Sequence, residues 1–318
     1  MRSNKPPLIL IVGPTAVGKT ELAIELAERI PPGGEIVSAD SRLFYRGMDI
    51  GTAKPTPAEQ MRVPHHLIDI AEPDEILSLA VFQQKAQAAI ADIHTRNKIP
   101  FLVGGTGQYV RAVTEGWSPP EVEPDERLRG EMERWKVERG AYWLYEKLKQ
   151  LDPVAAEKID ARNYRRTIRA LEVILTTGRR FSEQRGQTES PYHLIAVGLT
   201  RPRPELYERL DRRIEAMYAS GFLDEVKTLL AKGYSPSLPT MSAIGYRECI
   251  RVIKGEWSEE QAKAEMRRLT RIFVRRQANW FKESDPNIRW FRNQEGIVDE
   301  IDSYIRNAAR DGGWSAQM

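Results

Sequence analysis

Short apolar runs and amphipathic stretches alternate along the first third of the chain. Residues 8–13, 34–40 and 99–107 are largely apolar runs, and each predicts a buried strand. Residues 20–30 and 79–97 carry their apolar side chains at helical spacing, so each predicts an amphipathic helix. Strands that alternate with helices indicate an α/β fold, in which a parallel sheet has helices on both faces.

The pattern changes after Trp117. Residues 118–126 are rich in proline and acidic residues, which predicts a linker. Two stretches with helical spacing follow, at 126–140 and 165–180, and residues 192–200 then return to the apolar pattern of a strand. We therefore expect a helical module inserted between two strands of one sheet.

This pattern predicts two domains. Residues 1–117 and 191–318 form the α/β domain, and residues 118–190 form an inserted all-helical domain. The remainder of the α/β domain is expected to be helical, with helices in 203–221 and in the basic segment 258–283.

Composition is that of a soluble globular protein. The 318 residues are 41% hydrophobic and 29% charged, and no stretch approaches the length of apolar sequence that spans a bilayer. The first residues lack the apolar region of a signal peptide. Cys249 is the single cysteine, which excludes an internal disulfide and a cysteine-rich zinc site. We expect a monomer in the cytoplasm with no membrane partner.

Positive charge is concentrated in two places although the net charge is only +3. Six arginines lie between residues 162 and 180 against one acid, Glu172, and five lie between residues 267 and 276 with no acid. Such runs are either solvated helix faces or binding surfaces for a polyanion, and composition alone leaves both open.

A phosphate-binding motif connects the first predicted strand and helix. Residues 13–20 have the form G-x-x-x-x-G-K-T, in which two glycines let the loop wrap a phosphate and the lysine adds a positive charge. The threonine hydroxyl of such a motif is a ligand for Mg²⁺, so Thr20 is the candidate metal ligand. The candidate phosphate-binding residues are Gly13, Pro14, Thr15, Ala16, Val17, Gly18, Lys19 and Thr20.

Two other strand ends fall at the same edge of the predicted sheet. Asp40 ends the second strand, and Gly104–Gly107 follow the third. In a parallel sheet, ligands bind at the carboxyl ends of the strands, so both should lie beside the phosphate loop. The motif alone fits a nucleotide-hydrolysing enzyme or a kinase, but the N-K-x-D motif that recognises guanine is absent from the sequence.

Seven motifs together resemble the tRNA dimethylallyltransferase family, also called tRNA isopentenyltransferases. In chain order they are GPTAVGKT (13–20), DSRLFYRGMDIGTAKP (40–55), VPHHLID (63–69), VGGTGQY (103–109), NYRRTIRALEV (163–173), AIGYRE (243–248) and RRQANWF (275–281). The resemblance covers residues 8 to about 283. Two positions depart from it, because Leu43 stands where many members have glutamine and Gln108 stands where an apolar residue is usual.

The resemblance implies a reaction and its partners. A dimethylallyl group would pass from dimethylallyl diphosphate to N6 of adenosine 37, beside the tRNA anticodon, and diphosphate would leave. Mg²⁺ is the implied cofactor. The implied fold is a P-loop NTPase-like parallel sheet with a helical insertion that grips the anticodon stem-loop.

The implied catalytic residues are Asp40, Thr106 and Arg213. Adenine N6 is a weak nucleophile, so the reaction needs a base for its proton and positive charge for the leaving diphosphate. Asp40 is the candidate base, and a helix cap or a Mg²⁺ ligand is the alternative role for it. Thr106 and Arg213 would stabilise the diphosphate, together with Lys19 and the loop.

The resemblance also implies a set of residues that face tRNA. They are Asp40, Ser41, Arg42, Leu43, Thr106, Arg129, Arg165, Arg166, Thr167, Ile168, Arg169, Ser242, Ala243, Ile244, Gly245, Tyr246 and Arg247.

Three other features are given structural roles. Trp280 and Phe281 end a predicted helix and are expected in the core rather than stacked on bases. Adjacent His65 and His66 point to opposite sides of an extended stretch, so hydrogen bonding is favoured over a metal site. Cys249 lies in a helical pattern and is expected to pack as a small buried residue.

Without the resemblance, two other functions fit. A kinase of a small molecule or nucleoside would use the same phosphate loop, and a non-catalytic RNA-binding ATPase would use the arginine runs. A third alternative is a relative that prenylates free adenine nucleotides, which would have no need of the inserted module.

Overall fold

The computed structural model describes residues 5–312, except 119, 121, 185 and 188. The chain forms two compact units, one of residues 1–114 with 190–318 and one of residues 115–189. Positions 119 and 121 of the predicted linker lie outside the described residues. The same holds for positions 185 and 188 of the predicted insertion, and for 1–4 and 313–318 of the predicted α/β domain.

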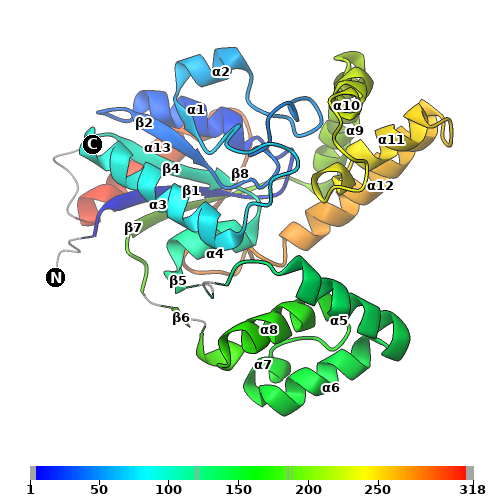
Figure 1. Ribbon diagram of the computed structural model, residues 1–318. Helices are drawn as coiled ribbons and strands as arrows, with labels where there is room; N and C mark the ends of the chain where they lie inside the picture. Colours follow the sequence, from blue (N-terminus) through cyan, green and yellow to red (C-terminus); the bar gives the residue numbers. More distant parts are fainter. Residues whose placement is uncertain (1–4, 119, 121, 185, 188, 313–318) are drawn as a thin grey trace. The chain divides into compact units, whose positions relative to one another are not determined.

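A parallel sheet forms the centre of the first unit (Figure 1). Among the described residues it has six strands, and every neighbouring pair is parallel. In spatial order the strands are β3 (His65–His66), β2 (Gly34–Ser38), β4 (Ile99–Gly104), β1 (Pro7–Val12), β7 (His193–Thr200) and β8 (Arg289–Arg292). The predicted P-loop-like α/β fold is confirmed.

Helices cover both faces of this sheet, because the side chains of each strand alternate between the faces. On β1, Ile9 and Ile11 pack with apolar residues of α1 and α13, whereas Leu8 and Leu10 pack with those of α3 and α4. All six residues of β1 are buried. The covering helices are α1 (Lys19–Arg29), α13 (Ile297–Asp311), α3 (Leu79–Thr95) and α4 (Gly107–Thr114).

A separate hydrophobic cluster joins further helices of the first unit. Phe222, Tyr246 and Met48 are fully buried in it, and the two aromatic rings meet edge to face with centroids 5.1 Å apart. The remaining helices of this unit are α2 (Pro57–Arg62), α9 (Arg203–Ala219), α10 (Phe222–Ala231), α11 (Tyr246–Ile253), α12 (Glu259–Gln277) and the 3₁₀ turn η2 (Thr240–Ser242).

The pattern predicted an entirely helical C-terminal part, and this prediction was wrong. β8 adds a parallel strand to the edge at β7, and it was missed because a four-residue run with one buried side chain, Phe291, has too few apolar positions to define a period. The predicted helix 258–283 ends earlier, at Gln277. Trp280 and Phe281 then pack in or against the core, as expected.

The second unit has its own core. Met132, Leu144, Leu148 and Leu171 are buried in one cluster of helices. Its elements are β5 (Trp117–Ser118), α5 (Glu126–Arg139), α6 (Ala141–Leu151), α7 (Pro153–Glu157), α8 (Tyr164–Thr177), η1 (Phe181–Glu183) and β6 (Gly186–Gln187). β5 and β6 form an antiparallel pair where the chain enters and leaves the unit, a feature that the sequence pattern did not predict.

No helix in the described part of the chain has the length and apolarity to cross a membrane. Cys249 lies on α11 and is buried, and its thiol donates to the Tyr218 hydroxyl at 3.5 Å. Burial raises the pKa of this thiol to about 11, so the cysteine is a packed residue, as predicted.

Candidate functional site

The phosphate loop leaves β1 and enters α1 at the carboxyl edge of the sheet. Gly18, with φ 102°, is the residue before the first turn of α1. It has no side chain to accept the first N–H groups of the helix, so these remain available to an anion. A Cβ at Gly13 would lie 2.6 Å from the Leu199 carbonyl oxygen, so only glycine fits between the loop and β7. The motif therefore has the strand–loop–helix setting that phosphate binding requires.

The Lys19 side chain folds back onto the phosphate loop. Its Nζ donates to the carbonyl oxygens of Gly13, at 3.1 Å, and Pro14, at 2.8 Å. Burial lowers the pKa of Lys19 to about 8, the carboxylate of Asp40 opposes this shift, and the charge of Arg213 adds to it. Lys19, Asp40 and Arg213 therefore lie close enough to act on one another electrostatically.

Asp40 is the second residue after β2 and begins a turn, not a helix, because its carbonyl oxygen accepts the Leu43 N–H at 3.2 Å. The Ala39 N–H donates to the Val103 carbonyl oxygen at 2.8 Å, which holds the chain at the sheet edge. One carboxylate oxygen of Asp40, Oδ1, accepts the Arg42 N–H at 3.0 Å. The side chain is half-buried, and its charge acts on Lys19 of the phosphate loop.

The glycine turn after β4 packs tightly against the other strand ends. A Cβ at Gly104 would lie 2.5 Å from the Ala39 carbonyl oxygen, and one at Gly107 would lie 2.3 Å from the Trp280 ring. Thr106 is half-buried between them, and its carbonyl oxygen accepts the Val110 N–H of α4 at 3.1 Å. The turn is therefore held at a fixed place beside Asp40.

Helix α9 contributes two arginines to this edge. Arg209 Nε donates to the Ala16 carbonyl oxygen of the phosphate loop at 2.8 Å. Arg213, one turn further, is half-buried. Burial and the charge of Arg209 lower the pKa of Arg213, and Asp40 opposes this shift. A cation that is desolvated beside a phosphate loop has strong affinity for an anion.

Oxygen donors for a metal ion are present at the loop. The Thr20 hydroxyl is exposed on the first turn of α1, and Asp40 supplies a carboxylate nearby. Within the described ranges, no group of three or more His, Cys, Asp or Glu residues could hold a metal. These donors fit Mg²⁺, which takes few protein ligands and completes its shell with phosphate oxygens and water.

The residues expected to face tRNA differ in exposure. Arg42, Arg165, Arg166, Ser242 and Arg247 are exposed. Asp40, Ser41, Leu43, Thr106, Arg129, Arg169 and Ile244 are half-buried. Thr167, Ile168, Ala243, Gly245 and Tyr246 are buried, so their side chains pack within their own unit.

Two of the predicted arginine contacts hold a buried acid in the helical unit. Glu172 is fully buried and accepts bonds from Arg129 Nε at 2.8 Å and Arg169 Nη1 at 2.6 Å. Burial pushes its pKa upward, but these bonds and the Asp125 N–H more than offset it and lower the pKa. Arg165 and Arg166, by contrast, are exposed on α8.

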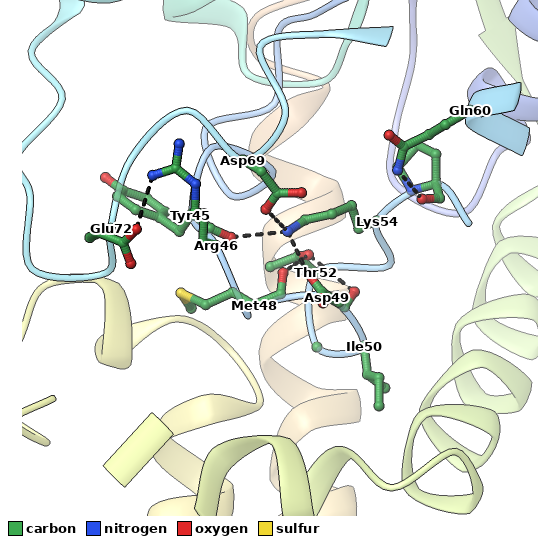
Figure 2. A network of polar contacts seen from close by, with 12 residues as sticks. Tyr45, Arg46, Met48, Asp49, Ile50, Thr52, Lys54, Gln60, Asp69 and Glu72 are labelled. Atoms are coloured by element: carbon green, nitrogen blue, oxygen red, sulfur yellow. Dashed lines mark hydrogen bonds and ion pairs between the residues drawn. The ribbon is translucent and has the colours of Figure 1, made fainter. Parts of the chain in front are cut away.

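A polar network fixes the loop that continues from Asp40 to residue 55 (Figure 2). Lys54, with only 4% of its side chain exposed, donates to the carboxylates of Asp49 and Asp69 and to the Tyr45 carbonyl oxygen. Glu225 of α10 accepts the N–H groups of residues 49–51 and the Tyr246 hydroxyl. The network thus links the Asp40 loop to the predicted tRNA-facing segment 242–247.

Sequence reasoning missed several residues that support the site: Lys54, Gln277, which bonds Thr15 and Gly105, and Asn293. Lys54 and Gln277 lie inside quoted motifs, and the motif was the available indication of their importance. Asn293 Nδ2, which donates to the Val17 carbonyl oxygen at 2.6 Å, lies in no motif.

The two histidines form hydrogen-bonding contacts, as predicted: His65 Nδ1 lies 2.7 Å from the Val63 carbonyl oxygen, and His66 Nε2 lies 2.7 Å from the Glu35 carboxylate.

Known proteins match almost the whole chain. The family model for IPP transferase matches residues 43–284. A tRNA dimethylallyltransferase of Roseiflexus sp. (strain RS-1) is 55% identical over 89% of this chain and 92% of its own length. One from Thermomicrobium roseum is 43% identical over 97% of this chain and 93% of its own length.

Solved structures agree with these matches. The tRNA isopentenylpyrophosphate transferase of Bacillus halodurans is 41% identical, with a TM-score of 0.72 and coverage of 97% of this chain and 98% of that one. A eukaryotic dimethylallyltransferase solved while acting on tRNA is 26% identical, with a TM-score of 0.75 and coverage of 98% and 80%.

Proposed function

The chain belongs to the IPP transferase family, and we propose that its sheet edge transfers a dimethylallyl group from dimethylallyl diphosphate to N6 of adenosine 37 in tRNA. The observation that carries this proposal is the convergence of a phosphate loop with Asp40, Thr106 and Arg213. A phosphate loop beside a carboxylate suits a reaction in which diphosphate leaves as a proton is removed. The product is N6-(dimethylallyl)adenosine.

The proposed chemistry assigns each group one role. A bond forms between N6 and the allyl carbon C1, and the bond from C1 to the diphosphate oxygen breaks with its electron pair. Asp40 takes the proton from N6. The first N–H groups of α1, with Lys19, Thr106 and Arg213, stabilise the charge on the departing diphosphate.

Mg²⁺ is the proposed cofactor. The Thr20 hydroxyl would be its protein ligand, and the Asp40 carboxylate would lie near it. Bound there, the ion supplies charge neutralisation for the diphosphate. The loop N–H groups and Lys19 of the protein bind the diphosphate themselves, and the ion adds further positive charge to the site.

The anticodon stem-loop of tRNA is the proposed second substrate. An adenine stacked in the loop cannot reach the allyl carbon, so the base must swing out of the stack. The exposed Arg42, Ser242 and Arg247 lie on segments linked through the Glu225 network. We propose that the helical unit grips the same stem-loop through Arg165 and Arg166 of α8, and that the enzyme acts as a monomer in the cytoplasm.

Salt dependence tests the role of the helical unit. The double variant Arg165→Ala/Arg166→Ala should bind tRNA more weakly, and the slope of log Kd against log salt should fall by about one to two, since each phosphate contact releases counterions. Both side chains are exposed, so folding should be unaffected. Filter binding between low and moderate salt measures the slope.

The matched control is Arg162→Ala, an exposed arginine that lies just before α8 and is already paired with Asp160. A wild-type slope in the double variant would exclude these two arginines as the clamp. Donor affinity should be unchanged in both variants.

The lowered pKa of Lys19 predicts a pH dependence for donor binding. The diphosphate binds the charged ammonium, whose pKa is about 8 without ligand and rises toward its usual value when an anion is bound. Donor affinity should therefore be highest below pH 8 and fall by about tenfold from pH 7 to pH 9. Calorimetric titration of dimethylallyl diphosphate measures this, and Lys19→Met should remove the pH dependence. Lys98→Met, the control, should keep it, because Lys98 Nζ donates to the Pro32 carbonyl oxygen and not to the phosphate loop.

Diphosphate release tests the reaction class. The enzyme should release diphosphate from dimethylallyl diphosphate when unmodified tRNA is added, with no ATP present. A requirement for ATP, or release with free adenine nucleotide in place of tRNA, would contradict the proposal and favour a kinase or a nucleotide prenyltransferase.

A further inference from the structure

One buried side chain joins two of the loops at the sheet edge. Gln277, the last residue of α12, is 6% exposed. Its Oε1 accepts the N–H of Thr15 in the phosphate loop at 2.9 Å. Its Nε2 donates to the carbonyl oxygen of Gly105 in the turn after β4 at 3.2 Å. An amide carries one acceptor and one donor group, and both are used here on different strand ends.

The fit around this amide is close. A Cβ at Gly105 would lie 2.4 Å from Gln277 Nε2 and 3.2 Å from the Gly13 carbonyl oxygen. The phosphate loop and the glycine turn therefore meet almost backbone to backbone. Gln277 fills the remaining space and pairs with the half-buried Thr15 N–H and the buried Gly105 carbonyl oxygen.

The end of α12 also holds the other side of the same turn. The Trp280 ring packs on Gly107, where a Cβ would lie 2.3 Å from it. Arg111 of α4 donates to the Trp280 carbonyl oxygen at 3.2 Å and stacks over the ring at 5.6 Å. Gly105 and Gly107 flank Thr106, so the last residue of α12 and the turn that follows it constrain both neighbours of that threonine.

We propose that Gln277 is a positioning residue for the group-transfer step. It sets the separation between the diphosphate loop and Thr106, and it does so before the donor binds because its bonds are to backbone groups of the protein. This inference rests on the proposed role of Thr106 in stabilising the diphosphate. Displacement of a catalytic group by about 1 Å costs on the order of 10² in rate, so the loss of this link should appear in turnover.

Gln277→Met tests the proposal, because the methionine side chain has a length and volume similar to those of glutamine but makes neither hydrogen bond. We expect kcat to fall by about 10- to 100-fold, since the loops lose their fixed separation. The Kd for tRNA should stay within about twofold, because tRNA affinity depends on phosphate contacts elsewhere. Measurements are made well below the melting temperature of the variant.

Val274→Ala is the matched control. Val274 lies one turn earlier on α12, is equally buried at 6% exposure, and packs in the apolar core. It should lower the melting temperature and leave kcat within about threefold, as expected for a core truncation away from the site. Equal losses of kcat in the two variants would overturn the proposal, since Gln277 would then act only through the stability of the helix.

A double-mutant cycle with Thr106→Ala separates this inference from the proposed function. If Gln277 acts through Thr106, then Gln277→Met should cost less than about threefold in the Thr106→Ala background. If the losses of kcat in the two single variants add fully in the double variant, the inference about Gln277 is overturned and the proposed function is not affected. A Thr106→Ala variant with wild-type kcat would overturn the proposed role of Thr106, and the inference with it.

Discussion

Replacing Asp40 with asparagine should lower kcat by roughly 10²–10⁴, the usual range for loss of a general base. The change is nearly isosteric and removes only the charge and basicity of the carboxylate. Asparagine Oδ1 can still accept the Arg42 N–H that holds the turn, so the loop should keep its shape. Affinity for both substrates should stay within a few-fold. Single-turnover kinetics with saturating donor and tRNA measure the loss at the chemical step.

The two roles open for Asp40 give different results. A base gives a loss that added Mg²⁺ does not repair, whereas a metal ligand gives weaker donor binding that excess Mg²⁺ partly rescues. Asp92→Asn, an exposed carboxylate on α3 outside the site, serves as the charge control and should be silent. Near wild-type turnover in a folded Asp40→Asn variant would contradict both roles.

Replacing Lys19 with alanine should act on the donor alone. We expect kcat/KM for dimethylallyl diphosphate to fall by about 10²–10³, as for the loss of one strong group that stabilises a developing anion. Two effects contribute to this loss, because the ammonium is proposed to contact the diphosphate and also bridges the Gly13 and Pro14 carbonyl oxygens. The Kd for tRNA should be unchanged if the loop binds the donor alone, as proposed.

Arg29→Ala provides the matched control for that variant. Arg29 ends the same helix and is paired with Asp299 on the surface, so its loss should leave donor affinity at the wild-type value. An equal loss of tRNA and donor affinity in folded Lys19→Ala would contradict the division of the site between the two substrates.

The sequence predicted the strands that carry long apolar runs. β1, β2, β4 and β7 are buried along most of their length, so hydrophobicity alone defines them. It did not predict β3, a strand of only His65 and His66, or β8, because a short edge strand has too few buried positions. Their pairing depends on the neighbouring strand rather than on local pattern.

The strand ends that carry Asp40 and Thr106 were predicted, whereas the contacts that hold the phosphate loop were not. Asp40 and Thr106 follow apolar strands, and parallel topology brings strand ends to one edge. The partners of the phosphate loop come from distant sequence: Gln277 lies 262 residues from Thr15, and Asn293 lies 276 from Val17. No local pattern encodes such pairs.

Residue ranges taken from a family resemblance mix two kinds of position. In 165–169, Arg165 and Arg166 are exposed, whereas Thr167 and Ile168 are buried on the inner face of α8. Helical periodicity explains the difference, because neighbours on a helix point in different directions. The range therefore marks the helix that is proposed to meet RNA, and exposure selects the side chains that can do so.

Nucleoside mass analysis tests the central claim most directly. The full chain is incubated with unmodified tRNA, dimethylallyl diphosphate and Mg²⁺, and the tRNA is then digested to nucleosides. The account predicts N6-(dimethylallyl)adenosine from tRNA with adenosine at position 37, and none from the same tRNA with another base there. Unmodified adenosine after prolonged incubation with folded enzyme, or prenylation of free nucleotides in preference to tRNA, would contradict it.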